Sequence, residues 1–168
     1  MDEKINILRT ILVVLLFIMF GIIFNFSNQD GEKSGNLSRE VTENVTKNIN
    51  SIQKLEKSEK EKVLNRIEHY IRKLAHFSLY LVVGILTMSL MYTFDLKNIK
   101  KILTSLGIGM FYATSDEIHQ VFIPERNASI FDVLIDSCRV LTGILIIFGI
   151  VKIFLRLKKH EKKAKNVE

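Results

Sequence analysis

The stretch YATSDEIHQVFIPERNASIFDVLID, residues 112–136, lies in the most apolar part of the chain, yet it holds five carboxylates, a histidine, an arginine and the only proline. Apolar sequence flanks it on both sides. An ionisable group costs roughly 2.5 to 3.5 kcal/mol at the centre of a bilayer on insertion scales, so several together need partners, water or a ligand. This stretch is therefore where we expect function.

Four apolar blocks decide the class of protein. Each approaches or exceeds the ~20 residues that a helix rising about 1.5 Å per residue needs to cross ~30 Å of hydrocarbon. Because a helix satisfies its own backbone in lipid, we expect an all-α integral membrane bundle of four transmembrane helices. It forms one domain over residues 1–168, with predicted spans at residues 10–26, 74–94, 102–123 and 130–154.

The first block follows a basic flank, Lys4 and Arg9, as a signal peptide would. No pair of small residues in the usual cleavage pattern follows it, so we interpret it as an anchor that is retained. The single cysteine, Cys138, excludes an internal disulfide and has no partner for a thiolate metal site. We interpret it as a small packing residue.

Basic residues indicate the topology. An even number of crossings leaves both termini on one side, and the positive-inside rule places Lys97, Lys100, Lys101 and the basic tail, residues 155–168, in the cytoplasm. The outer segment, residues 27–73, holds ten basic and eight acidic residues, so total charge favours neither orientation. We expect a multi-pass protein of the cell membrane with cytoplasmic termini. The basic tail suits anionic lipid better than nucleic acid.

The outer segment carries two helical patterns. Its first apolar stripe consists of Leu37, Val41, Val45, Ile49 and Ile52. The second follows a capping-box pattern, Ser58 with Glu61, and runs directly into the second span. We expect two amphipathic helices on or near the membrane surface, over the mouth of the bundle; packing on another protein is the alternative.

Polar stripes recur on three predicted spans, at one end of the bundle and at similar depth. Helical spacing of three and four residues places each stripe on one face. The simplest inference is one shared ligand-binding site that opens to the outer leaflet. Its predicted residues are Arg72, Lys73, His76, Tyr80, Tyr112, Asp116, Glu117, His119, Gln120, Arg126, Asp132 and Asp136.

Several of these residues also have structural interpretations. Ser129 with Asp132 matches a helix-start pattern, and Asp136 with Arg139 is spaced for an ion pair. The cations near span ends, Arg72, Lys73 and Arg126, can extend to the interface. Asp116, Glu117 and His119 are harder to explain in this way, because no helix cap is expected so far inside the third span. The glycines predicted to permit close helix packing are Gly84, Gly107, Gly109 and Gly143.

Two kinds of chemistry remain open at this site. The weak candidates for a metal site are His76, Asp116 and His119, although their spacing is not diagnostic. Acid–base chemistry would pair His119 with Asp116 or Glu117, while Arg126 and Arg72 hold an anionic group such as a phosphate. No nucleophile stands out. The residues do not decide whether the protein binds a cofactor or whether it is an enzyme.

The chain resembles the VanZ-like family of small bacterial membrane proteins over nearly its whole length. The resemblance rests on RKLAHFSLY at residues 72–80, YATSDEIHQVFIPER at 112–126, FSNQDGEKSGNLS at 26–38 and the stretch at 132–143. Two positions depart from the family pattern. Glu125 and Arg139 stand where glycine is common.

The resemblance implies a cell-envelope protein of Gram-positive bacteria that lowers susceptibility to glycopeptide antibiotics such as teicoplanin. Its ligand would then be a lipid, a wall precursor or the lipoglycopeptide itself, bound without chemistry. The alternative is an intramembrane enzyme that modifies a lipid or wall-linked substrate by acid–base or metal-assisted chemistry. A proton-coupled carrier is a weaker third hypothesis. The expected partner is the lipid bilayer, and the sequence leaves open whether the chain also forms a homo-oligomer.

Overall fold

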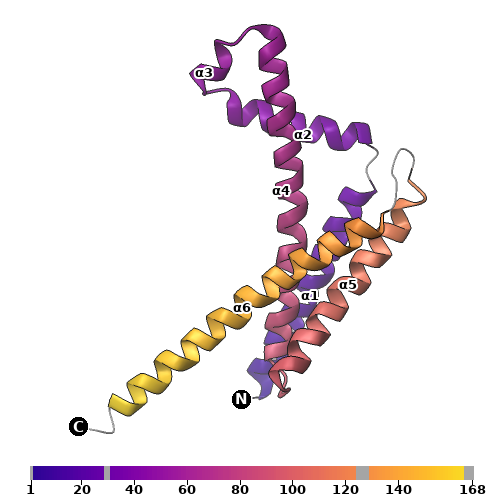
Figure 1. Ribbon diagram of the computed structural model, residues 1–168. Helices are drawn as coiled ribbons and strands as arrows, with labels where there is room; N and C mark the ends of the chain where they lie inside the picture. The colour runs from indigo at the N-terminus through magenta and orange to yellow at the C-terminus, as the bar shows by residue number, and fades with distance from the viewer. Residues whose placement is uncertain (1, 29–30, 124–128, 165–168) are drawn as a thin grey trace.

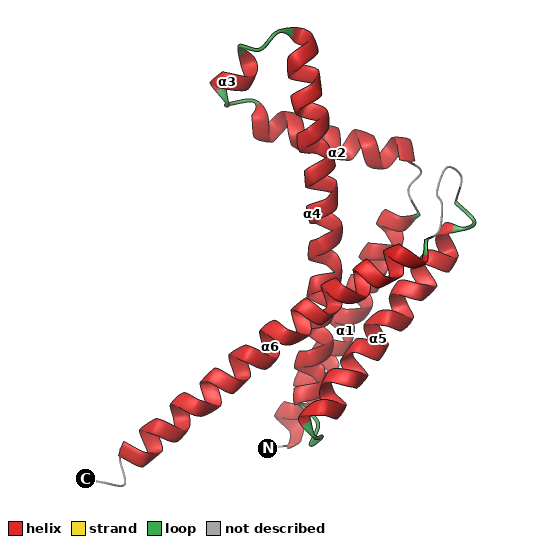
Figure 2. Ribbon diagram, in the orientation of Figure 1, coloured by secondary structure: helices red, strands yellow, loops and turns green. Residues whose placement is uncertain are grey.

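The computed structural model describes residues 2–28, 31–123 and 129–164. Within these ranges the chain is helical apart from short connections and contains no strand (Figure 2), which confirms the all-α prediction. The helices are α1 (Asp2–Ser27), α2 (Gly31–Thr46), α3 (Asn50–Gln53), α4 (Lys57–Tyr92), α5 (Asn98–Gln120) and α6 (Ile130–Ala164).

The bundle consists of α1, the C-terminal half of α4, α5 and the N-terminal half of α6 (Figure 1). α4 and α6 run in one direction, and α1 and α5 run in the other. α6 crosses its neighbours at a slant, and its C-terminal half extends away from them. At the lower end of the bundle Arg9 of α1 donates to the Thr93 carbonyl oxygen over 2.6 Å, which ties the start of α1 to the end of α4.

Three helices in the described ranges are long and apolar enough to cross a membrane: Glu3–Ser27, Lys57–Tyr92 and Ile130–His160. α5 is not among them. Its 23 residues are sufficient in length, but Lys100 and Lys101 at its start, with Asp116 and Glu117 near its end, make it less apolar. The structure thus supports a multi-pass membrane protein, and the fourth crossing stays a prediction.

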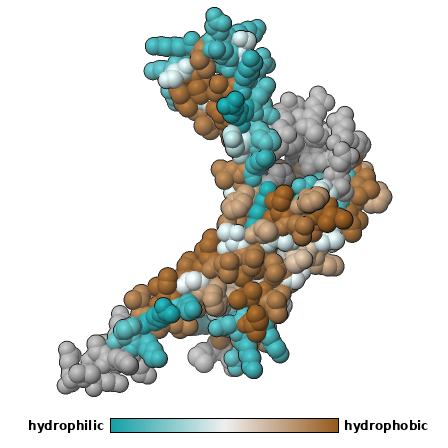
Figure 3. All heavy atoms as spheres, viewed as in Figure 1, coloured by the Kyte–Doolittle hydropathy of each residue, from teal (hydrophilic) through white to brown (hydrophobic). Residues whose placement is uncertain are grey.

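The surface of the bundle suits contact with lipid. Apolar side chains form a broad band over the bundle and α6, while polar side chains cover the end formed by α2, α3 and the start of α4 (Figure 3). Phe111, Phe122 and Phe131 are each at least 75% exposed. Exposed apolar surface on this scale is unfavourable in water and is expected of helices that face acyl chains.

The outer segment follows the predicted helical order, with α2 first and then a helical stretch that continues into the predicted second span. Its second helical stretch is the beginning of α4, a continuous helix of 36 residues that extends about 54 Å and rises beyond the bundle. The predicted capping box does not form, because α4 begins at Lys57 and its N-cap residue, Glu56, makes no side-chain capping bond. Leu64 on this stretch is buried, whereas Tyr70 and Leu74 are exposed, so only part of its apolar face packs within the protein.

α2 runs across α4 and buries a face that the apolar pattern did not predict. Ser38, Thr42 and Thr46 are buried, whereas Val41 and Val45 are exposed. The hydroxyls of Thr42 and Thr46 each donate over 2.7 Å to the carbonyl oxygen one turn earlier, so their burial leaves no donor unpaired. Small side chains on this face let α2 approach α4 closely.

Arg39 fixes the position of α2 on α4. Its guanidinium donates to the Asn65 side-chain oxygen over 2.8 Å and lies 3.8 Å from Glu61 and 3.9 Å from Glu68. Three polar partners on one helix orient the arginine more firmly than a single exposed ion pair would.

Glycines permit backbone contact between α4 and α6. A Cβ at Gly84 would overlap the Val140 carbonyl oxygen, and one at Gly143 would overlap that of Leu81. Gly109 on α5 faces the Val140 side chain in the same way. The close-packing prediction therefore holds for these three glycines and is wrong for Gly107, where a methyl group would meet nothing within 4 Å.

Replacement of Gly143 by alanine should force α4 and α6 apart, since a backbone atom cannot move aside as a side chain does. Overpacking of this kind costs about 1 to 3 kcal/mol of unfolding free energy. Gly107→Ala is the matched control and should be neutral or slightly stabilising, because its site is open. Unfolding in detergent, followed by helical circular dichroism, measures both; equal losses would contradict the assigned contact.

Candidate functional site

Asp116 of α5 lies at the centre of a polar cluster between α4 and α5. Its Oδ2 accepts a hydrogen bond of 3.2 Å from the hydroxyl of Tyr80 on α4 and one of 3.1 Å from Gln120 Nε2 on α5. Tyr80 is almost wholly buried, and Asp116 is 7% exposed. Two neutral donors thus hold one carboxylate oxygen inside the bundle.

Glu117 joins the same end of α5 to α6. One of its carboxylate oxygens accepts the backbone N–H of Ser129 over 3.0 Å, directly before α6 begins. The Ser129 hydroxyl oxygen in turn accepts the N–H of Phe131 over 3.2 Å. A carboxylate at a helix N-terminus is stabilised by the unpaired N–H groups and by the helix dipole. The expectation that these carboxylates serve no helix cap is therefore wrong for Glu117.

α6 adds a buried ion pair. Asp136 is 7% exposed and pairs with Arg139 on the next turn, as the spacing predicted. Asp136 lies one turn before Val140, and Tyr80, the partner of Asp116, lies one turn before Gly84, which contacts Val140, so Asp136 belongs to the same end of the bundle. The three carboxylates, one on α6 and two on α5, therefore lie at one end of the bundle, and we call them the carboxylate cluster.

Tyr112 and His119 continue the stripe of α5 on the side that meets α1. The Tyr112 ring stacks on Phe20 with centroids 3.9 Å apart, and its hydroxyl donates to the Phe20 carbonyl oxygen over 2.5 Å. His119 stacks on Phe24 at 4.6 Å, and its Nε2 lies 3.4 Å from Asn28 Oδ1. These contacts place α1 beside the cluster.

The residues of α1 were missed in the sequence, although they carry a usable signal. Phe20, Phe24 and Asn28 recur every four residues and so share one face of the helix. This signal is an aromatic pair followed by an amide on one face, at the end of an apolar span.

The structure brings only part of the predicted set together. Hydrogen bonds join the described side chains of Tyr80, Asp116 and Gln120. Glu117 bonds to the Ser129 amide, and Asp136 pairs with Arg139 at the same end of the bundle. Lys73 is exposed, and so is Asp132, whose predicted capping partner Ser129 is bonded to Glu117. The side chains of Arg72 and His76, and all of Arg126, lie outside the described part of the chain.

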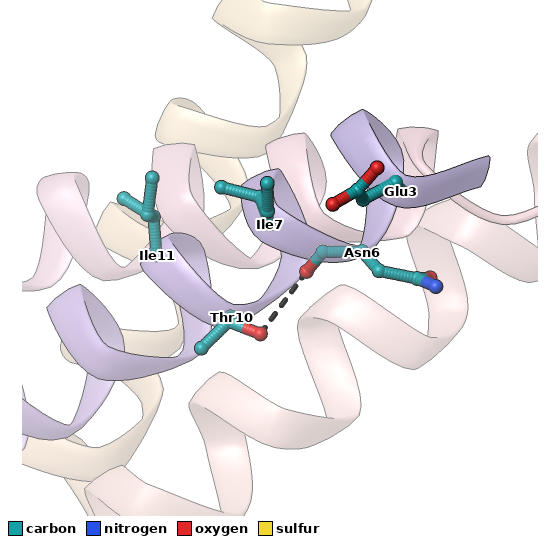
Figure 4. A pocket seen from close by; sticks show the side chains of 5 residues that line it. All are labelled: Glu3, Asn6, Ile7, Thr10 and Ile11. Carbon is teal, nitrogen blue, oxygen red and sulfur yellow. Dashed lines mark hydrogen bonds between the residues drawn. The ribbon is translucent and has the colours of Figure 1, made fainter. Parts of the chain in front are cut away.

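One surface hollow elsewhere lies on a single helix. It lies at the opposite end of the bundle and is lined by Glu3, Asn6, Ile7, Thr10 and Ile11, all on one face of α1 (Figure 4). The Thr10 hydroxyl donates to the carbonyl oxygen of Asn6 over 3.0 Å, so it is already satisfied within its helix. A hollow lined by a single helix brings no groups together from different elements.

The chain matches a known protein family. The model of the family described as VanZ/LLP1 matches residues 12–155. The chain belongs to this family. The match begins within α1 and ends within α6, so it includes the whole carboxylate cluster. No curated protein and no solved structure matches the chain.

Two observations concern the charge of the carboxylate cluster and the metal interpretation of this VanZ-like chain. Arg139 supplies the cation that pairs with Asp136. The described side chains contain no group of three or more histidine, cysteine, aspartate or glutamate residues arranged for a metal. Asp116 and His119 contact different helices, α4 and α1. The metal interpretation stays a prediction without support from these contacts.

The hydrogen bond from Tyr80 to Asp116 predicts energetic coupling between them. A double-mutant cycle of Tyr80→Phe and Asp116→Asn, read from unfolding free energies in detergent, should give about 0.6 kcal/mol, the mean for polar contacts between membrane helices, and at most about 1.7 kcal/mol. The control cycle pairs Tyr112→Phe with Asp116→Asn and should give coupling near zero, because that hydroxyl bonds to Phe20. Equal coupling in both cycles would contradict the assignment.

Proposed function

We propose that this VanZ-like protein is a non-enzymatic envelope protein whose carboxylate cluster binds the polar head of an amphiphile in the outer leaflet. The candidate ligands are a lipid, a lipid-linked wall precursor and the lipoglycopeptide teicoplanin. The observation that carries the proposal is the convergence of polar groups from α4, α5 and α6 at one end of an apolar bundle. An aliphatic core would be cheaper in lipid than buried carboxylates, and such residues commonly mark functional sites.

The arrangement of the helices supports a fourth crossing by α5. α1 qualifies as a span, and α5 runs beside it in the same direction, with matched ring contacts at Phe20 and Phe24. A helix in register with a span over this length occupies the same depth. α5 also returns the chain from the end of α4 to the beginning of α6, at opposite ends of the bundle.

The contacts of the cluster favour binding over catalysis. An acid–base pair needs its two groups within hydrogen-bond reach of each other or of one reacting group. His119 is engaged with Phe24 and Asn28, whereas Glu117 accepts the Ser129 amide and Asp116 faces Tyr80. These groups hold helices in place and present carboxylate oxygens, which suits recognition of hydrogen-bond donors.

An amphiphilic ligand suits the surroundings of the cluster. Ile118, Val121 and Phe122 near the end of α5 are exposed, as are Ile130 and Phe131 at the start of α6. An acyl chain can lie along this apolar surface while the polar head reaches the bundle end. Teicoplanin carries an acyl chain, and a wall precursor is linked to a lipid, so both fit this geometry.

Cysteine labelling tests the crossing by α5. In a Cys138→Ser background, an impermeant maleimide should label Phe122→Cys in intact cells and Lys97→Cys only after permeabilisation, because the two positions flank α5. Lys54→Cys, in the outer segment, should label like Phe122→Cys. Labelling of positions 97 and 122 from the same side would show that α5 does not cross.

Antibiotic susceptibility tests the role of the cluster. In cells that the wild-type protein protects, Asp116→Asn should return the inhibitory concentration of teicoplanin to that of cells lacking the protein. Asp95→Asn removes an exposed carboxylate at the other end of the bundle and should leave protection unchanged. Both variants are first matched for membrane abundance. Full protection by Asp116→Asn would contradict a site-based function.

Turnover separates binding from the enzymatic alternative. We expect purified protein to leave labelled envelope lipids unchanged, with or without divalent metal. Formation of a product that Glu117→Gln abolishes would favour the enzyme instead.

A further inference from the structure

Two buried polar atoms lack a hydrogen-bond partner among the described residues. They are Oδ1 of Asp116, the second oxygen of the carboxylate at the centre of the cluster, and Oγ of Ser27 in the last turn of α1. Ser27 is 2% exposed. Buried polar atoms are nearly always paired, and each exception calls for an explanation such as a ligand or water.

Both atoms lie on facing sides of α1 and α5. Ser27 is seven residues after Phe20 and three after Phe24, the two residues that stack on α5, so all three share a face. Asp116 lies between Tyr112 and His119, the α5 partners in those stacks, at spacings of four and three. The unpaired hydroxyl and the unpaired carboxylate oxygen thus belong to one end of the α1–α5 contact.

The charge of this region favours a cation. The described part of the carboxylate cluster contains Asp116, Glu117 and Asp136, and Arg139 is already paired with Asp136. A carboxylate oxygen only accepts hydrogen bonds when ionised, and a hydroxyl oxygen accepts as well. The complementary group carries positive charge and more than one N–H donor.

We propose that Asp116 Oδ1 and Ser27 Oγ receive the primary ammonium of an amphiphile head group. This inference rests on the proposed function and names the chemistry that the same site selects. An ammonium offers three N–H donors in a compact head, which is enough for both acceptors and leaves one donor for water or the ligand's own polar groups. A quaternary ammonium carries the same charge but has no N–H donor, so it could be attracted to the carboxylates without forming these hydrogen bonds.

Lipid titration of the purified full-length protein, read by native mass spectrometry, tests this inference. The probes are dioleoyl lipids that differ only in the head: phosphatidylethanolamine, its N-acetyl derivative, phosphatidylcholine and phosphatidylglycerol. We expect phosphatidylethanolamine to bind about tenfold more tightly than the other three, as expected for one charge-assisted hydrogen bond. Free ethanolamine should compete weakly, because the acyl chains contribute to affinity.

Two variants with matched controls locate the effect. Asp116→Asn should abolish the preference for the primary ammonium, and Ser27→Ala should reduce it severalfold. The controls are Asp95→Asn and Ser78→Ala, which alter exposed residues outside the cluster and should keep the preference. If Asp116→Asn fails to fold, Ser27→Ala tests the ammonium preference alone. This variant removes only one oxygen, at the end of a helix, so we expect it to fold.

The outcomes separate the two proposals. Saturable binding of all four lipids with equal affinity, or a preference unchanged in both site variants, overturns the ammonium inference and leaves amphiphile binding intact. Absence of saturable binding for every lipid overturns both.

Discussion

Backbone contact between α4 and α6 positions everything else at the polar end of the bundle. Gly84 faces the carbonyl oxygen of Val140, and Gly143 faces that of Leu81, so neither helix can rotate or slide without a clash. Tyr80 lies one turn before Gly84, and Asp136 lies one turn before Val140. Because the two helices run in the same direction, both polar residues are displaced toward the same end. The crossing therefore sets the depth of the site.

α5 is fixed to this crossing by Gly109, whose missing side chain makes room for Val140. Seven residues later, two helical turns toward the polar end, Asp116 meets Tyr80. Glu117 then caps α6, so the position of α5 and the start of α6 are set by neighbouring residues. Packing and polar bonding are thus linked, because the contacts that align the three helices also bring the carboxylates together.

Depth and helical phase were sufficient to predict that Tyr80 and Asp116 lie at the same level of the bundle, since both follow from residue spacing within single helices. The sequence could not show that Glu117 caps α6, because that bond depends on the path of the turn between two helices. The burial of Ser38, Thr42 and Thr46 was missed for a related reason. Apolar periodicity identifies faces that avoid water, whereas α2 packs through small residues whose hydroxyls bond to their own helix.

Arg139 shows how one substitution can alter the charge of such a site without moving it. With glycine at this position, Asp136 would lose the cation one turn away, and the carboxylate cluster would be more negative by one charge. Arginine pairs with Asp136 within α6 and leaves Asp116, on α5, as the carboxylate with an unpaired oxygen among the described residues. Ser27, the other buried residue with an unpaired oxygen among the described residues, lies on α1. In the ammonium site that we propose, selectivity therefore involves α1, the helix whose polar end the apolar pattern conceals.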